Sequence, residues 1–275
     1  MRHTILMLII FPMFFSCNNC ECDSDIDACD VVYLDSNGVT IKAYPCAEIG
    51  DVGVIEGIEY TVVDRSMLDD MLGPNGNSGA NEDFTKVCTT RVTDMNNLFL
   101  CHEDFNQPIG NWDVSNVTNM RWMFANECNQ FHQFNQSLSY WDVSNVTDMS
   151  YMFGMAFNFD QNISSWDVSS VTNMSGMFYR AEAFNHNISS WDVSNVTDMS
   201  WMFYGVNSYN QSILGWDTSL VTNMSYMFAD ATSFNQDSNN INTTSVIDCN
   251  NFCLNAVSWT LPKPNFSNCG DIGCD

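Results

Sequence analysis

The sequence predicts an α/β repeat solenoid of about seven 25-residue units, each with one short strand and one short helix. Two observations support this fold: an eight-residue motif returns at a nearly constant interval, and apolar residues recur inside it at helical spacing. Copies of the motif begin at Val92, Val117, Val146, Val171, Val196, Val221 and Val246. The steps between them are 25, 29, 25, 25, 25 and 25 residues, and such a period indicates stacked repeats.

The motif itself is predicted to form the helix of each unit. In the copy VTDMSYMF, Val146, Met149, Met152 and Phe153 lie at positions i, i+3, i+6 and i+7. This spacing places four apolar side chains on one helical face. A helix of two to three turns is marginal alone, so packing on the neighbouring repeat must stabilise it.

The strand of each unit is predicted in the segment FNQxIS, for example residues Phe184 to Ser189. It is short, it carries an apolar residue near each end, and a Trp-Asp turn follows it. We expect these strands to pair in parallel from repeat to repeat. The Asn of this segment is expected to bond successive backbones as a structural ladder.

The chain divides into five predicted regions: a signal peptide (1–16), an acidic tether (17–30), an N-terminal capping region (31–83), the repeats (84–253) and a C-terminal cap (254–275). Residues 31–44 should form a hairpin turning at Ser36 to Gly38, and a strand is expected near Tyr60. Ser66 could cap a short helix that follows.

The first 17 residues have the basic start, apolar run and small residue of a secretory signal. Ser16-Cys17 resembles a bacterial lipoprotein processing site, which makes Cys17 the predicted lipidation site. The protein is then expected at the cell surface as an outer-membrane lipoprotein, held to the membrane by its lipid. Ordinary cleavage and full secretion is the alternative.

Composition limits the classes of partner. The formal charge of −25, from 8 Lys and Arg against 33 Asp and Glu, repels phosphate backbones, so nucleic acid is not an expected partner. Twelve cysteines suit an oxidising compartment. Because they gather near the two ends and are absent from the middle repeats, disulfides are expected to staple the ends of the stack.

The recurring WDVSNVTDMSYMF with FNQ-I-S resembles the BspA-type leucine-rich-repeat surface proteins, the family built on the bacterial domain of unknown function 285. The resemblance covers about residues 84–253. It implies a leucine-rich-repeat-like, surface-exposed and often lipid-anchored protein, with adhesion or protein binding as its activity and no catalytic residues.

Two columns of repeated side chains raise the question of ligands. A row of five Trp residues, one in each of five repeats, could form a sugar-binding platform, but its constancy favours a core role with the indole N–H bonded to a neighbouring carbonyl. The Asp after each Trp could bridge calcium, although a local turn in which it accepts backbone N–H groups is favoured. This low-probability metal site comprises Asp113, Asp142, Asp167, Asp192 and Asp217.

The motif position that changes most between repeats is the predicted contact for a partner. It carries aromatic residues in four repeats, and large rings often anchor protein interfaces. These candidate partner-binding residues are Trp122, Tyr151, Trp201 and Tyr226.

No nucleophile, base and acid fall together and no glycine-rich phosphate loop is present, so the protein is predicted not to be an enzyme. The expected function is binding or adhesion to a protein or host surface ligand. A structural or calcium-stabilised envelope lipoprotein is the alternative.

Overall fold

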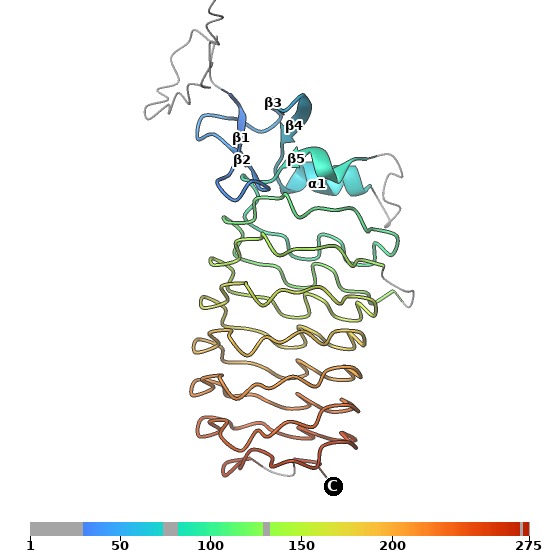
Figure 1. Cartoon of the computed structure of the whole chain (residues 1–275), viewed down its shortest axis with the longest axis vertical. Helices are drawn as coiled ribbons and strands as arrows, with labels where there is room; N and C mark the ends of the chain where they lie inside the picture. Colours follow the sequence, from blue (N-terminus) through green and yellow to red (C-terminus); the bar gives the residue numbers. More distant parts are fainter. Residues whose placement is uncertain (1–29, 74–81, 129–132, 270–271, 275) are drawn as a thin grey trace, which may run out of the picture.

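The computed structural model describes residues 30–73, 82–128, 133–269 and 272–274. The predicted signal peptide (1–16), nearly all of the predicted tether (17–30) and the candidate lipidation site Cys17 lie outside the described residues. In the described part, small sheets and one helix precede a stack of seven repeat layers that run down to the C-terminus (Figure 1).

The N-terminal region begins with the predicted hairpin. Strands β1 (Val32–Leu34) and β2 (Ile41–Ala43) pair antiparallel, and Gly38 lies in the turn with φ 72°. Strands β3 (Val52–Ile55), β4 (Ile58–Val62) and β5 (Val87–Cys88) form a second sheet in that order. β4 and β5 run parallel, as do the bridges that join the repeat layers after them.

Helix α1 (Arg65–Leu72) connects the two parts and buries Leu68 and Leu72 against the first layers. The prediction that Ser66 caps this helix is wrong. The cap is Asp64, two residues earlier, whose carboxylate accepts the Met67 N–H at 2.9 Å. A carboxylate reaches a free first-turn amide well from this position. The short 3-10 helix η2 (Phe84–Lys86) then leads into β5.

The predicted α/β solenoid of strand-and-helix units, resembling leucine-rich repeats, is wrong. Among the described residues α1 is the single α-helix, and all five strands end before residue 89. The repeats consist of turns, and successive layers are joined by isolated parallel bridges such as Asp148↔Asn173. The bridged position alternates Asp and Asn from layer to layer, which keeps like charges two layers apart.

The motif fails to form a helix because its amides bond the next layer instead. The N–H groups of Met149, Tyr151 and Phe153 donate to carbonyls of the following repeat at 2.9–3.0 Å. Tyr151 has φ 53°, in the left-handed region, which an α-helix cannot include. The Met152 N–H bonds the Met149 carbonyl three residues back, as in a turn. The four apolar side chains are nonetheless fully buried, so their shared core role is confirmed.

The predicted strand at FNQxIS is absent as well, although Phe184 and Ile188 are buried. Its Asn side chains supply the link between layers that a strand would have made. The Oδ1 of Asn210, for example, accepts the backbone N–H of Asn235 at 2.8 Å, and the same contact recurs along the stack. The expected Asn ladder is therefore confirmed.

The core consists of aromatic columns that run through the layers. Phe153 stacks on Phe159 of its own layer at 3.9 Å and on Phe178 of the next at 5.9 Å. The Trp column is buried, and the indole N–H of Trp166 donates to the Leu138 carbonyl at 3.0 Å. The core role predicted for these Trp residues is confirmed, and a sugar platform there is excluded because their rings are covered.

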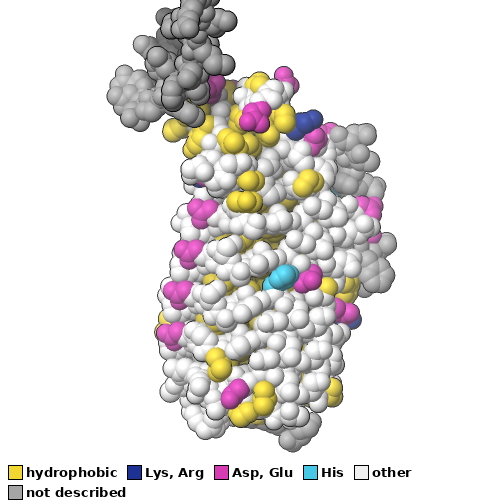
Figure 2. Space-filling view, viewed as in Figure 1, with side chains coloured by type: hydrophobic (Ala, Val, Ile, Leu, Met, Phe, Trp, Pro, Cys, Tyr) yellow, Lys and Arg dark blue, Asp and Glu magenta, His cyan; other side chains and the backbone are white. Residues whose placement is uncertain are grey.

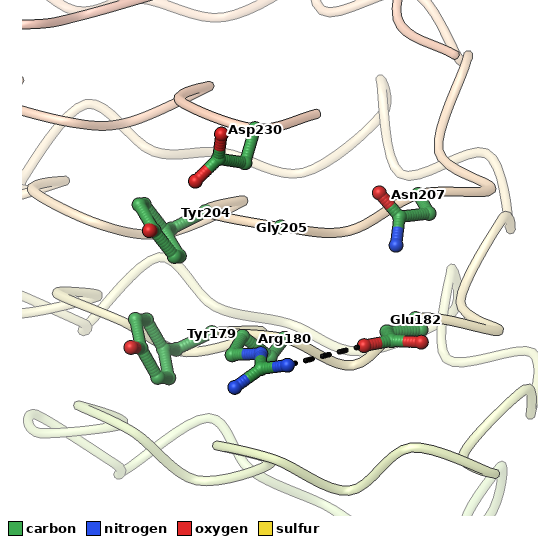
Figure 3. A pocket seen from close by; sticks show the side chains of 7 residues that line it. All are labelled: Tyr179, Arg180, Glu182, Tyr204, Gly205, Asn207 and Asp230. Atoms are coloured by element: carbon green, nitrogen blue, oxygen red, sulfur yellow. Dashed lines mark ion pairs between the residues drawn. The ribbon is translucent and has the colours of Figure 1, made fainter. Parts of the chain in front are cut away.

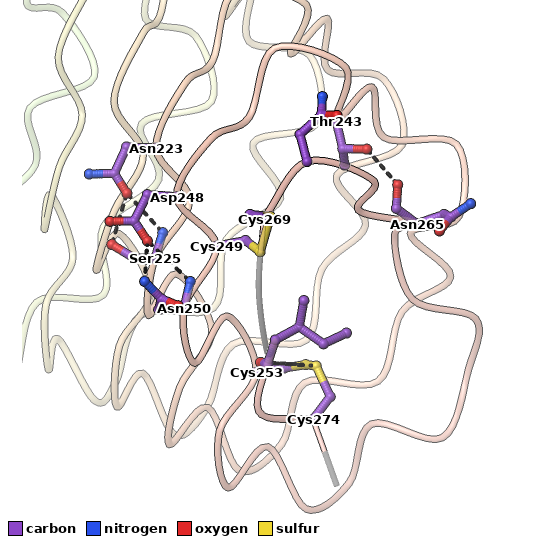
Figure 4. The surroundings of a disulfide bond; sticks show 12 residues. Asn223, Ser225, Thr243, Asp248, Cys249, Asn250, Cys253, Asn265, Cys269 and Cys274 are labelled. Carbon is purple, nitrogen blue, oxygen red and sulfur yellow. Dashed lines mark hydrogen bonds between the residues drawn. A yellow bond between two sulfur atoms is a disulfide. The ribbon is translucent and has the colours of Figure 1, made fainter.

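Disulfides close both ends of the stack, as expected. Cys101 pairs with Cys128 in the first layers, while two pairs join the last repeat to the C-terminal segment (Figure 4). These two pairs are Cys249–Cys269 and Cys253–Cys274. They tie down the end of the stack, where the last layer has no further layer to cover it.

Candidate binding surface

The four aromatic residues predicted to contact a partner occupy one equivalent position in their layers. Trp122, Tyr151, Trp201 and Tyr226 are half-buried, and each has a left-handed backbone with φ between 53° and 60°. Three other repeats keep the same backbone with Asn97, Gly176 and Asn251. The geometry of the turn, and not the side chain, therefore fixes the conformation of this position.

The four rings lie in one continuous row of aromatic contacts. Trp122 stacks on Tyr151 with ring centroids 4.3 Å apart, and Trp201 stacks on Tyr226 at 4.0 Å. Two further tyrosines join these pairs: Tyr179 lies 6.0 Å from Tyr151 and 6.1 Å from Trp201, and Tyr204 lies 5.0 Å from Trp201. We call this row of six rings the aromatic strip: Trp122, Tyr151, Tyr179, Trp201, Tyr204 and Tyr226.

Gly176 explains why the strip shifts sideways in the middle layer. A Cβ at Gly176 would lie 2.3 Å from Cε1 of Tyr151, so the Tyr151 ring already covers this position. Tyr179, three residues on, continues the row. The strip is thus continuous over five layers, even though one layer lacks an aromatic residue at the expected place.

The aromatic residues of the left-handed position are held against the preference of the backbone. A bulky L residue in this conformation costs about 1 kcal/mol, whereas Gly and Asn adopt it readily. Asn97 and Asn251 show that the layer accepts the cheaper residue. Four aromatic residues at such positions must offer a compensating gain, either from stacking on each other or from contact with a partner.

A pocket adjoins the strip between three successive layers (Figure 3). Its volume is about 330 Å³, within the lower range of pockets that hold small ligands. Tyr179 and Tyr204 form one side, and polar or charged groups form the rest. The lining residues are Tyr179, Arg180, Glu182, Tyr204, Gly205, Asn207 and Asp230.

Charged groups of both signs line the pocket. Arg180 and Glu182 form an exposed ion pair at 3.7 Å, and Asn255 donates to Asp230 at 2.9 Å. A hydrogen bond from the Tyr204 hydroxyl to Asp230 raises the pKa of Tyr204 to about 12. The tyrosine therefore remains protonated at neutral pH and holds the Asp230 carboxylate in place at the rim.

The aspartates considered for calcium are engaged in local turns, as the sequence favoured. The carboxylate of Asp192 accepts the backbone N–H of Ser194 at 3.0 Å, and each aspartate of this column makes the same contact two residues on. Bonds from the following Ser lower the pKa of Asp167, Asp192 and Asp217. Figure 2 shows acidic side chains in a row along one side of the layers.

These columns offer no compact metal site. Among the residues that the structure describes, no three His, Cys, Asp or Glu side chains gather so as to hold a metal ion. Asp113 is buried and accepts a hydrogen bond from the Thr90 hydroxyl at 2.6 Å, whereas Asp142, Asp167, Asp192 and Asp217 are exposed.

No helix in the described ranges is long and apolar enough to cross a membrane.

Sequence reasoning found four rings of the strip and missed the pocket beside it. Tyr179, Arg180, Tyr204 and Asp230 lie one or two residues after the MF of their motifs, in a segment that changes from repeat to repeat. Aligning these variable segments, FYRAEAF with FYGVNSY, would have placed Tyr179 beside Tyr204 and Arg180 beside Gly205. That alignment was the available signal.

One family model matches the chain, namely that of the family described as Mycoplasma protein of unknown function, DUF285. It matches residues 67–172, 129–196 and 153–266, which together span more than half of the chain. No curated protein matches the chain, and no solved structure does.

Proposed function

We propose that this chain, which belongs to the DUF285 family, is a non-catalytic surface protein that binds or adheres to an extracellular partner through the aromatic strip. In this proposal it is a BspA-type surface lipoprotein, secreted and held to the outer membrane through a lipid on Cys17.

The observation that carries the proposal is the aromatic strip itself. Half-buried Trp and Tyr residues stand at left-handed positions that two other layers occupy with Asn97 and Asn251. Large rigid rings lose little conformational entropy on binding, and Trp and Tyr dominate the binding energy of protein interfaces. A row of six such rings, rimmed by polar side chains, has the composition of an anchoring surface.

Asparagine is the substitution that tests this role, since it already occupies the same turn in two layers. The test variant carries Trp122→Asn, Tyr151→Asn, Trp201→Asn and Tyr226→Asn together. The control is Tyr140→Asn, which removes a ring that is 51% exposed and lies outside the strip.

Binding of the purified chain to immobilised mucin and to a collagen-type matrix is the measurement. We expect the four-site variant to lose at least about tenfold in affinity for the surface that the native chain binds, while the control binds normally. Unchanged binding by a folded four-site variant would contradict the role of the strip and favour a purely structural envelope protein.

A further inference from the structure

The pocket beside the aromatic strip exists because one layer lacks a side chain. Gly205 has φ 64° and occupies the position held by Arg180 in the layer before and by Asp230 in the layer after. A Cβ at Gly205 would lie 3.2 Å from Cγ of Arg180, so a side chain here would crowd Arg180 and reduce the hollow. The hollow opens to solvent because Arg180 and Asn207 are exposed.

Hydrogen-bond donors and acceptors alternate around this hollow. Arg180 presents N–H donors, while Glu182 and Asp230 present carboxylate oxygens. The Oδ1 of Asn207 accepts a bond from the Thr232 hydroxyl at 3.0 Å, and its amide nitrogen is turned toward the Glu182 side in Figure 3. A ligand that bonds all of these groups must itself carry groups that both donate and accept.

Charge narrows the class of ligand further. A cationic ligand would be attracted by Glu182 and Asp230 but would meet the Arg180 guanidinium inside the pocket. An anionic ligand would meet Glu182 and Asp230, as well as a protein with a formal charge of −25. A neutral ligand with several hydroxyl groups avoids both repulsions, because each hydroxyl can accept from Arg180 or donate to a carboxylate.

The aromatic side of the pocket also suits a ligand with several hydroxyl groups. Tyr179 and Tyr204 stack at 5.1 Å and form a wall with apolar ring carbons and polar hydroxyl tips. A sugar ring has the same division, with C–H groups on its faces and hydroxyls around its edge. Pockets that bind small ligands commonly combine such aromatic walls with a few directional polar groups.

We propose that this pocket binds a neutral carbohydrate, so that the partner surface contacted by the aromatic strip is a glycan. The inference rests on the proposed binding function and names its ligand class. The sugar ring contacts Tyr179 and Tyr204, and its hydroxyls bond Arg180, Glu182 and Asp230.

The test is calorimetric titration of the purified full chain with neutral gluco-, galacto- and manno-oligosaccharides. Glucuronate-containing oligosaccharides, chitosan oligomers and a lysine-rich peptide serve as charged probes. We expect a neutral oligosaccharide to bind more tightly than the charged probes. Binding of only charged probes, or of no saccharide at millimolar concentration, would overturn the proposal.

Two variants link the binding to the pocket. Gly205→Asn fills the hollow. The backbone accepts Asn because Asn255 has the same left-handed conformation, φ 56°, two layers on, but the Arg180 side chain must move because the new Cβ lies 3.2 Å from its Cγ. Asp230→Asn keeps the shape of the side chain and removes its charge. We expect each to weaken binding of the neutral oligosaccharide at least about tenfold, with thermal unfolding confirming that each is folded.

Binding that survives both variants would place the sugar elsewhere and refute the pocket. The matrix-binding assay separates this failure from that of the proposed function. If no saccharide binds but the four-site strip variant still loses matrix binding, the carbohydrate proposal fails and the adhesion proposal stands. If the neutral oligosaccharide binds at the pocket while the strip variant keeps its matrix binding, the pocket proposal is supported and the strip is not the adhesive surface.

Discussion

Two sets of aromatic rings run along this molecule, one in the core and one on the surface. In the core, Phe124 stacks on Phe153 with centroids 5.6 Å apart, and both are fully buried. On the surface, Trp122 stacks on Tyr151 at 4.3 Å in the same two layers, and both are half-buried. The stacking is alike, yet the core position is Phe in six successive layers while the surface position changes from ring to Gly or Asn.

This difference separates two reasons for an aromatic residue. In the core every layer must fill the same volume, because neighbouring layers supply the same walls, and packing at native density leaves little freedom. At the surface the backbone prefers Gly or Asn, so a ring there must be compensated, either by stacking on its neighbours or by contact with a partner. The following changes test this division, beginning with the largest expected effect.

Phe153→Ala should be the most destabilising of these changes. The ring is fully buried between Phe124, Phe159 and Phe178, so its removal leaves a cavity that stiff neighbouring layers cannot fill. We expect a loss of roughly 3–5 kcal/mol in the free energy of unfolding, measured by urea titration. A loss below about 1 kcal/mol would show that the layers collapse around the gap and that the core column is less rigid than its stacking indicates.

Tyr209→Phe should act in the opposite direction. Tyr209 replaces the Phe found at this position in neighbouring layers, and its hydroxyl is buried without a hydrogen-bond partner among the described residues. Burial raises the pKa of this phenol. Removing the hydroxyl should stabilise the protein by about 1 kcal/mol, and Phe184→Tyr, the reverse change one layer earlier, should destabilise it. A less stable Tyr209→Phe variant would reveal a partner for the hydroxyl.

Ser194→Ala should produce the smallest effect, confined to the exposed turns. Bonds from Ser194 lower the pKa of Asp192 below its ordinary value of 3.8, so this carboxylate stabilises the fold above that pH and the contribution is lost as the pH falls through the lowered pKa. The variant should move the pKa of Asp192 upward, as measured by NMR titration. The control Ser219→Ala should instead raise the pKa of Asp217. If the pKa of Asp192 is unchanged in the Ser194→Ala variant, the role of the Ser194 hydroxyl is contradicted.

The sequence predicted the contents of the core better than the path of the backbone. Val146, Met149, Met152 and Phe153 are buried as expected, because apolar side chains at a fixed period must share an interior. The same spacing of three residues, however, fits a series of turns as well as a helix. The hydrogen bond from the Tyr151 N–H to a carbonyl of the next layer favours the turns over the helix. The sequence of a single repeat does not reveal such a contact.

The candidate surface was predicted in part for a similar reason. Aligning the repeats shows one position that varies most within a nearly constant motif. The aromatic residues at that position are Trp122, Tyr151, Trp201 and Tyr226. The pocket depends on which variable segments lie side by side, and on the missing side chain of Gly205. These relations become visible only when the variable segments after the motif are aligned from repeat to repeat, and the constant motif does not show them.

The most direct test of the division between core and surface rings is the unfolding free energy of the variant with Asn at positions 122, 151, 201 and 226. Asn suits the left-handed backbone, so relief of the backbone cost should offset the lost stacking. We predict a free energy of unfolding within about 1 kcal/mol of the native value, together with loss of surface binding. A loss of several kcal/mol, as expected for core rings, would show that the strip exists to hold the layers together.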